Sequence, residues 1–357
     1  MDALATIQRN LNYSKAGPST VVYVIEGDIK GCFDNIDHHL LMERVRRRVG
    51  DRKVLRLLLA FLKAGVMAEG AFRRSEAGTP QGGIISPLLA NVMLSALDER
   101  YDRWTPSATD TPISAMQRRR LDRKKGRPTF FHVRFADDFV ILVSGSREEA
   151  EAEKQRLTDF LRENLRLELS PEKTLITPVA EGFTFLGYRV VMEPARLSGR
   201  TLGKLKIPKD RLQRIRDRIK KITGRETTNL TFEALLRRLL NPVILGWRNY
   251  YRYATGASKE FGRLDKRVWL RVQRWLRNKH ETRTAMWVRK RYQRRIGNRN
   301  QWLENGVSLR RFIDGGTEYY PVRGYSIPSG WEAERNRGSN LTDSVNASTE
   351  RWGCLFW

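Results

Sequence analysis

The chain has 357 residues, with 67 Lys/Arg against 40 Asp/Glu, a net charge of +27 and a pI of about 10.6. This length suits two domains with a substantial core, and the charge predicts a polyanionic partner. Two cysteines are too few for a disulfide framework or a zinc cluster, and no apolar run is long enough to span a membrane.

The first two hundred residues mix predicted strands with predicted helices. In chain order we expect a helix at 4–11, a strand at 21–25, helices at 38–49 and 53–64, a strand at 69–75, and helices at 88–103 and 147–167. Residues 105–128 are rich in Pro, Ser and Thr and then densely basic, so we expect an exposed connection. Hairpins mixed with helices favour an α+β fold over a doubly wound sheet.

The basic charge is concentrated in one segment. Residues 201–300 contain 29 Lys/Arg and 7 Asp/Glu, and the pattern there predicts helices at 209–223, 231–254, 258–280 and 284–294. Aromatic residues are interleaved with the charges, which argues against a disordered tail. We expect Trp247, Tyr250 and Tyr251 to form core rather than to stack on bases. Residues 295–330 appear irregular, and 331–357 match no motif.

Two adjacent carboxylates, Asp137 and Asp138, lie between two apolar runs at 132–143. The β-branched and aromatic residues of both runs predict a hairpin with the acids at its turn. An isolated pair of this kind is most often an exposed turn, but Asp28 also ends an apolar strand about a hundred residues earlier. Three carboxylates brought together suit Mg²⁺, which prefers oxygen ligands, and two such ions can clamp a phosphoryl transfer.

Six motifs in order resemble those of group II intron reverse transcriptase/maturases, over about residues 1–325. The first palm motif is similar to Glu26-Gly27-Asp28-Ile29-Lys30-Gly31-Cys32-Phe33-Asp34-Asn35-Ile36-Asp37-His38. The second resembles residues 78–91, and the Tyr-Ala-Asp-Asp signature resembles Phe135-Ala136-Asp137-Asp138, with Phe for Tyr. Residues 169–174, 185–188 and 241–251 resemble the two following motifs and the maturase-specific thumb.

The resemblance implies a right-hand polymerase palm, a small antiparallel sheet with helices, followed by an all-α basic thumb/maturase domain. It implies four metal ligands, which are Asp28, Asp137, Asp138 and the Ile29 carbonyl, for two Mg²⁺ ions, with Mn²⁺ as a substitute. Lys173 would be catalytic at the departing pyrophosphate, or else a surface lysine. The implied substrate-binding residues are Phe33 (alternatively a core residue), Pro80, Gln81, Gly82 and Phe135. Asp34 and Asp37 are interpreted as structural or capping residues.

The sequence departs from the family at its start. Only 27 residues precede Asp28, whereas the family carries a longer N-terminal portion that forms the fingers, so we expect most of the fingers to be lacking. The expected domains are a fingers remnant at 1–20, the palm at 21–200, the thumb/maturase domain at 201–300 and an irregular, partly disordered region at 301–357.

The resemblance implies an RNA-directed DNA polymerase that also binds intron RNA for splicing and mobility. Its partners would be intron RNA, an RNA template, a DNA primer or target and dNTPs, with no membrane. The alternatives are a splicing-only, RNA-binding maturase or an inactive fragment; a retron-type reverse transcriptase is disfavoured by the long thumb. We expect a bacterial cytoplasmic protein, with an organelle as the alternative.

Overall fold

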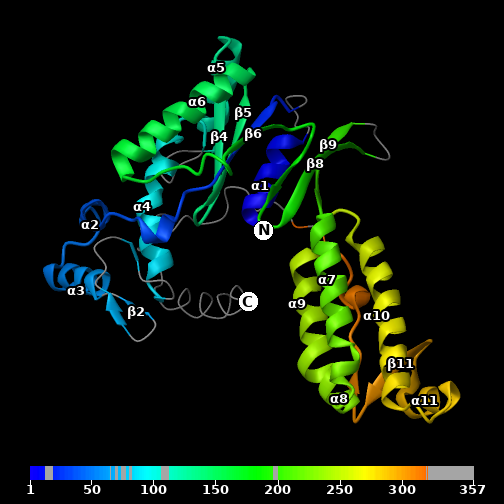
Figure 1. Cartoon of the computed structure of the whole chain (residues 1–357). Coiled ribbons are helices and arrows are strands. Elements are labelled where there is room, and N and C mark those ends of the chain that lie inside the picture. Colours follow the sequence, from blue (N-terminus) through cyan, green and yellow to red (C-terminus); the bar gives the residue numbers. More distant parts are fainter. Residues whose placement is uncertain are drawn as a thin grey trace, which may run out of the picture. The chain divides into compact units, whose positions relative to one another are not determined.

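The structure is a computed structural model that describes residues 1–12, 19–64, 66–68, 71–73, 78–79, 83–105, 112–195, 200–318 and 320. The chain forms two compact units (Figure 1). One contains residues 21–176, and the other combines residues 3–20 with residues 177–320. The four domain ranges expected from the sequence stay a prediction.

A four-stranded sheet forms the centre of the unit at 21–176. Its order is β4-β5-β1-β6, with bounds Thr129–Phe135, Asp138–Ser144, Tyr23–Gly27 and Leu175–Pro178. Strand β5 pairs antiparallel with both β4 and β1, from Phe135↔Asp138 to Thr129↔Ser144 and from Gly27↔Phe139 to Tyr23↔Val143. Residues 139–144 are all buried, which explains the near-continuous apolar sequence of this strand.

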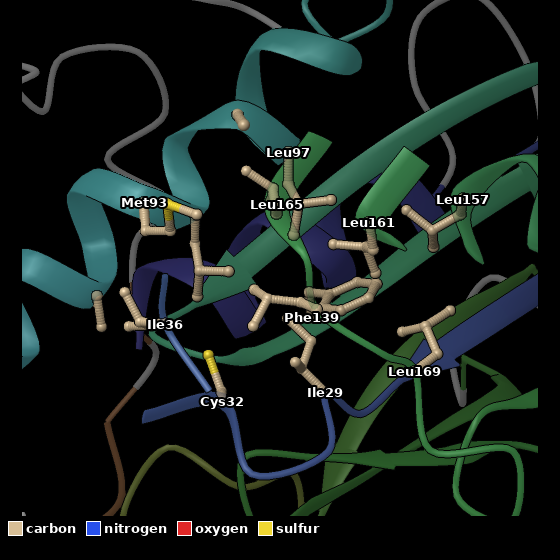
Figure 2. Packing of buried hydrophobic residues seen from close by; sticks show 14 of the residues in the cluster. Ile29, Cys32, Ile36, Met93, Leu97, Phe139, Leu157, Leu161, Leu165 and Leu169 are labelled. Atoms are coloured by element: carbon tan, nitrogen blue, oxygen red, sulfur yellow. The ribbon is translucent and has the colours of Figure 1, made fainter. Parts of the chain in front are cut away.

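Helices cover this sheet and complete its core. They are α2 (His38–Arg46), α3 (Arg52–Lys63), α4 (Ser86–Arg100), α5 (Pro112–Lys124) and α6 (Arg147–Phe160), with the short helices η1 (Cys32–Asp34) and η2 (Leu161–Leu165) and the hairpin β2 (Val66–Ala68) and β3 (Ala71–Arg73). The Asp37 carboxylate accepts the backbone N–H of Leu40 at 2.9 Å, which confirms its predicted role as a cap. Figure 2 shows Phe139 among Ile29, Leu161 and Leu165 in the core.

Residues 112–124 correct one expectation, because they form helix α5 rather than an exposed connection. Asp122 is 4% exposed and accepts two hydrogen bonds from Arg103, at 2.9 and 2.8 Å, and one from Trp104 Nε1 at 3.1 Å. Ala115 is also fully buried. These tertiary contacts hold a segment whose dense positive charge suggested a solvated loop.

The other unit joins a small sheet to a helical region. Helix α1 (Asp2–Leu11) lies on a sheet of order β7-β8-β9 (Phe183–Phe185, Tyr188–Pro194, Thr201–Lys206), because Gln8 Nε2 donates to Gly203 O and Gly203 N–H donates to Asn12 Oδ1. The helices are α7 (Lys209–Ile222), η3 (Arg225–Thr227), α8 (Phe232–Ala234), η4 (Leu235–Leu240), α9 (Asn241–Tyr251), α10 (Ala257–Lys279), α11 (Ala285–Tyr292) and η5 (Phe312–Gly315).

Three further strands form a sheet that the sequence pattern did not indicate, β10 (Gln293–Ile296), β11 (Arg299–Glu304) and β12 (Val307–Ser308). The expected α+β class, a small antiparallel sheet with helices followed by a helical domain, is confirmed. No helix within the described ranges is both long and apolar enough to cross a lipid bilayer.

Candidate active site

The strand register brings the predicted acids to one end of the central sheet. Phe135 pairs with Asp138, so Ala136 and Asp137 form a two-residue hairpin turn. Gly27 pairs with Phe139 on the other side of β5. One step further along the same antiparallel register, Asp28 lies beside Asp138. Two segments a hundred residues apart therefore bring Asp28, Asp137 and Asp138 to the same end of the sheet.

Gly27 is required by close packing rather than by an unusual backbone. A Cβ atom built on Gly27 would lie 2.1 Å from Cζ of Phe139 and 2.8 Å or less from two further ring atoms. The Phe139 ring is 1% exposed and occupies the space that a side chain would need. Any larger residue at position 27 must displace this ring or the strand that carries Asp28.

The hairpin turn is strained and braced. Ala136 has φ of +55°, the left-handed region that glycine usually fills at this position of a hairpin turn. The Arg134 guanidinium donates to Ala136 O at 2.9 Å and to Asn91 Oδ1 at 2.7 Å, and it forms a two-bond contact with the Asp98 carboxylate. Arg134 therefore connects the turn to helix α4, which carries both Asn91 and Asp98.

The second partner of Asp98 is a buried histidine. His132 Nδ1 lies 3.4 Å from Asp98 Oδ1, and its ring stacks on Tyr101. Burial raises the pKa of Asp98, but the hydrogen bonds from His132 and Arg134 outweigh it and hold that pKa below its usual value. Burial lowers the pKa of His132, which keeps the imidazole neutral.

A cavity of about 310 Å³ opens at these acids. It is lined by Asp28, Ile29, Lys30, Gly31, Cys32, Phe33, Asp34, Asp137, Ser170 and Lys173. Ser170 N–H donates to Asp28 O at 2.8 Å, and Lys30 N–H donates to Glu168 O at 2.9 Å. The Lys173 ammonium lies 3.3 Å from Asp28 Oδ2. Because Lys173 is 70% exposed, this ion pair contributes little stability.

Asp138 experiences the negative charge of the two neighbouring acids. Burial raises the pKa of Asp138, and the Asp137 and Asp28 carboxylates raise it further. Burial and the Asp137 charge also raise the pKa of the nearby Cys32 thiol to about 12. Two neighbouring acids oppose the ionised form of Asp138, and a bound cation would relieve this repulsion.

The oxygen atoms at this site are of the kind that binds a hard divalent cation, but among the described residues their side chains do not enclose an ion. Within the described ranges, no three His, Cys, Asp or Glu side chains come close enough together to share an ion. Carboxylate oxygens and a backbone carbonyl are the ligands that Mg²⁺ takes. The raised pKa of Asp138 and the position of the Lys173 ammonium beside Asp28 both agree with a place for positive charge.

Residues 5–190 match the family model described as reverse transcriptase (RNA-dependent DNA polymerase), and residues 212–295 match the group II intron, maturase-specific domain. The chain belongs to the group II intron type of reverse transcriptase. It is 37% identical over 209 residues to Protein YkfC of Escherichia coli (strain K12), a match that covers 54% of this chain and 53% of YkfC.

A second relative of this reverse transcriptase is the group II intron-encoded protein LtrA of Lactococcus lactis subsp. cremoris. The two are 35% identical over 228 residues, which cover 53% of this chain and 37% of LtrA. The chain thus spans about half or less of these relatives. Among solved structures, apo telomerase from Candida tropicalis matches 81% of this chain and 46% of its own at 13% identity, with a TM-score of 0.39, a similarity too low to support any argument about function.

The predicted site residues of this reverse transcriptase are partly brought together. Asp28, Ile29, Phe33, Asp137 and Lys173 line the cavity, and Asp138 lies beside Asp28 in the strand register. Phe135 is 48% exposed and is not among the cavity residues. Pro80, Gln81 and Gly82 lie outside the described residues.

Gly78 and Thr79 are hydrogen-bonded to the first palm motif. Gly78 N–H donates to Ile36 O at 2.8 Å, and Thr79 N–H donates to Phe33 O at 2.7 Å. Gly78 has φ of +86°, and a Cβ there would lie 2.6 Å from Asp34 O. His38 Nε2 also lies 2.6 Å from Gly78 O. The Gly78-Thr79 peptide therefore packs directly on the backbone that carries Phe33.

In the other unit, tyrosines hold the turn at 185–188, which resembles one of the family motifs. The Tyr250 hydroxyl donates to Leu186 O at 2.6 Å, and the Tyr251 hydroxyl donates to Gly187 O at 3.2 Å. The Tyr188 hydroxyl in return donates to Tyr250 O. Tyr251 is buried, as expected of a core residue, whereas Tyr250 is 47% exposed.

Sequence reasoning missed Gly27, Arg134, Asn91 and Asp98 as residues that shape the site. Gly27, Arg134 and Asn91 lie within or directly beside the quoted motifs, whereas Asp98 lies outside them. Their roles depend on partners 36 and 43 residues away in the case of Arg134, so no local pattern reveals them.

Proposed function

We propose that this chain is an RNA-directed DNA polymerase of the group II intron maturase type, which also binds intron RNA for splicing and mobility. The observation that supports the proposal is the position of three acids at one end of the central sheet: Asp28 and Asp137 line the cavity, and their charges add to burial in raising the pKa of Asp138. Three ionised acids held close together in a partly buried site destabilise the fold unless a cation neutralises their charge.

Asp28, Asp137, Asp138 and the Ile29 carbonyl would hold two Mg²⁺ ions, with Mn²⁺ as a substitute. When bound, such ions supply charge stabilisation to both the attacking and the leaving oxygens of a phosphoryl transfer. The chain's own contribution is to fix the ligands: the β1–β5 register positions Asp28 against Asp138, and Arg134 holds the turn that carries Asp137.

The remaining predicted residues would bind and orient the nucleotide. Phe33 lines the cavity five residues beyond Asp28 and would pack against the incoming sugar, disfavouring a 2′-hydroxyl. Pro80, Gln81 and Gly82 would complete that pocket, and Phe135 would offer its exposed ring to the substrate. Lys173 lines the same cavity and would give a proton to the departing pyrophosphate.

The RNA-binding part of the proposal rests on charge. Residues 201–300 hold 29 of the 67 Lys/Arg of the chain, and the surface of helix α7 exposes Arg211, Arg214, Arg218, Lys220 and Lys221. An RNA or RNA–DNA duplex is bound mainly through phosphates and 2′-hydroxyls. Binding should therefore weaken steeply with added salt.

Primer extension on an RNA template tests the polymerase directly. The parent protein is compared with Asp137→Ala and with Asp159→Ala, which removes an exposed acid of α6. We expect Mg²⁺-dependent extension by the parent and by Asp159→Ala, and none by Asp137→Ala. Extension that survives in Asp137→Ala would mean that the acids do not carry the reaction.

The second candidate is a maturase that binds RNA and does not polymerise. It is favoured by the Lys173–Asp28 ion pair, which already neutralises one acid without a metal ion. This candidate predicts tight, salt-sensitive binding of intron RNA by the parent protein and no extension under any Mg²⁺ or Mn²⁺ concentration. Extension by the parent would exclude it.

A further inference from the structure

Helix α5 is a rigidly docked element rather than a mobile basic loop. Its inner side holds the bidentate contact between Asp122 and Arg103. Arg118 Nε donates to Arg103 O at 2.8 Å, and the Arg119 guanidinium lies 4.7 Å from the centre of the Phe131 ring in β4. These contacts fix the rotation of α5 about its own axis and so determine which residues face solvent.

The outward face of α5 is cationic. At 100° per residue, positions 116, 117, 120, 121 and 124 fall on the side opposite the buried Ala115 and Asp122, and all five are exposed. Arg120 and Lys124 are neighbours four residues apart on this face, and the exposed Lys125 and Arg127 continue the charge beyond the helix.

Three cations of this surface, Arg120, Lys124 and Lys125, are unpaired within the described residues. Across the described chain, no side-chain hydrogen bond or ion pair is formed by Arg120, Lys124 or Lys125. The acid of this helix, Asp122, is already neutralised by Arg103. Arg123, half-buried beside this face, loses hydration, which lowers its pKa. The helix thus holds positive charge in a fixed array without internal compensation.

We propose that the exposed face of α5, with Lys125 and Arg127, binds the phosphate backbone of RNA at a surface separate from the basic segment 201–300. The inference rests on the proposed function only in taking RNA as the partner. Phosphate contacts by Arg and Lys are the main source of affinity for nucleic acids and need no base-specific groups. A face pre-arranged by buried contacts binds without the cost of ordering a loop.

An anionic membrane surface fits this face less well. Helices that bind membranes bury a continuous apolar stripe, whereas α5 exposes only Met116 and Leu121 among its described side chains, at 52% and 56%. These two residues lie on opposite edges of the cationic face, with Arg120 and Lys124 between them. Two separated apolar side chains bury too little apolar area for stable membrane binding, and they do not prevent the cations from contacting a phosphate backbone.

The test removes three exposed charges at once and measures RNA affinity against salt. The variant is Arg120→Gln/Lys124→Gln/Lys125→Gln, and its matched control is Arg46→Gln/Lys53→Gln/Arg56→Gln, which removes the same charge from exposed positions of α2 and α3. The probe is a short RNA duplex, titrated by fluorescence anisotropy between about 50 and 200 mM salt. Circular dichroism and thermal unfolding verify that both variants are folded.

We expect the slope of log affinity against log salt to fall by about 2 in the α5 variant, with about a tenfold or greater loss of affinity, and to change by less than about 1 in the control. Equal losses in both variants would mean a general charge effect and would overturn the proposal. Unchanged RNA binding by the α5 variant would also overturn the proposal. So would a variant that loses affinity for phosphatidylglycerol vesicles, measured in parallel, but not for RNA. Because no nucleotide is needed, the result stands whether or not the chain extends a primer.

Discussion

The contact between Gly27 and Phe139 makes Gly27→Ala a sharp test of how the palm holds its acids. Gly27 lies within strand β1 and its φ is not in the left-handed region, so alanine is conformationally acceptable there. The only obstacle is the Phe139 ring, 2.1 Å from the added Cβ. The effect of the substitution therefore measures one packing contact, between the residue before Asp28 and the residue after Asp138.

The expected cost follows from the overlap. Real Cβ atoms keep more than 3.0 Å from their neighbours, so the ring or the strand must move by about 1 Å or more, and overpacking of this kind costs about 1–3 kcal/mol. For a unit of this size that corresponds to a fall in Tm of roughly 3–10 °C. The movement also shifts Asp28 against Asp138, so we expect primer extension to fall about tenfold or more, because a misplacement of about 1 Å is costly at a reacting centre.

Urea unfolding and primer extension measure the two effects, and a second substitution isolates the cause. Phe139→Leu removes ring atoms, so it should lower stability alone but restore part of the loss in the Gly27→Ala background. A double-mutant cycle should give a coupling free energy of about 1 kcal/mol or more in the favourable direction. If Gly27→Ala is as stable and as active as the parent, or if the two substitutions are additive, the packing argument is wrong.

Three further predictions concern the charged groups of the palm. Arg134→Lys keeps the charge but loses the planar guanidinium that donates to several acceptors at once. We expect extension to require a several-fold higher Mg²⁺ concentration and the free energy of unfolding to fall by about 1–2 kcal/mol. An unchanged Mg²⁺ titration would mean that Arg134 does not hold the turn in place. Asp138→Asn should raise Tm without metal and abolish extension, because burial and the charges of Asp137 and Asp28 all disfavour the ionised Asp138 carboxylate. A lower Tm would contradict this. Burial lowers the pKa of His132 and keeps it neutral in the folded state, whereas the unfolded chain gains a proton on this side chain near pH 6.5. The free energy of unfolding should therefore fall by up to about 1.4 kcal/mol between pH 7.5 and pH 5.5. The fall should be smaller in His132→Gln, and equal falls in the two proteins would refute the assignment.

Local sequence determined much of this protein. The β-branched and aromatic residues of 129–144 specify a hairpin, and Asp37 and Asp51 cap the helices that follow them. The sequence also predicted that Asp28, at a strand end, and Asp137-Asp138, at a turn, form one site; the register brings these segments to the same end of the sheet, and their shared role stays a prediction. Caps and hairpin arms depend on residues a few positions apart, which a linear sequence displays directly.

Tertiary structure decided the rest. The bracing of Ala136 by Arg134 depends on Asn91 and Asp98 from a distant helix, and the space beside Gly27 is filled by a ring that arrives more than a hundred residues later. Helix α5 formed where charge and Pro/Ser content indicated a loop, and it is docked by the tertiary contact that buries Asp122 against Arg103. Propensity acts over a few neighbouring residues, whereas packing and ion pairing act between any groups that the fold brings within a few ångströms. The sequence therefore predicted which acids belong to the site, and the tertiary structure determined which residues hold them in place.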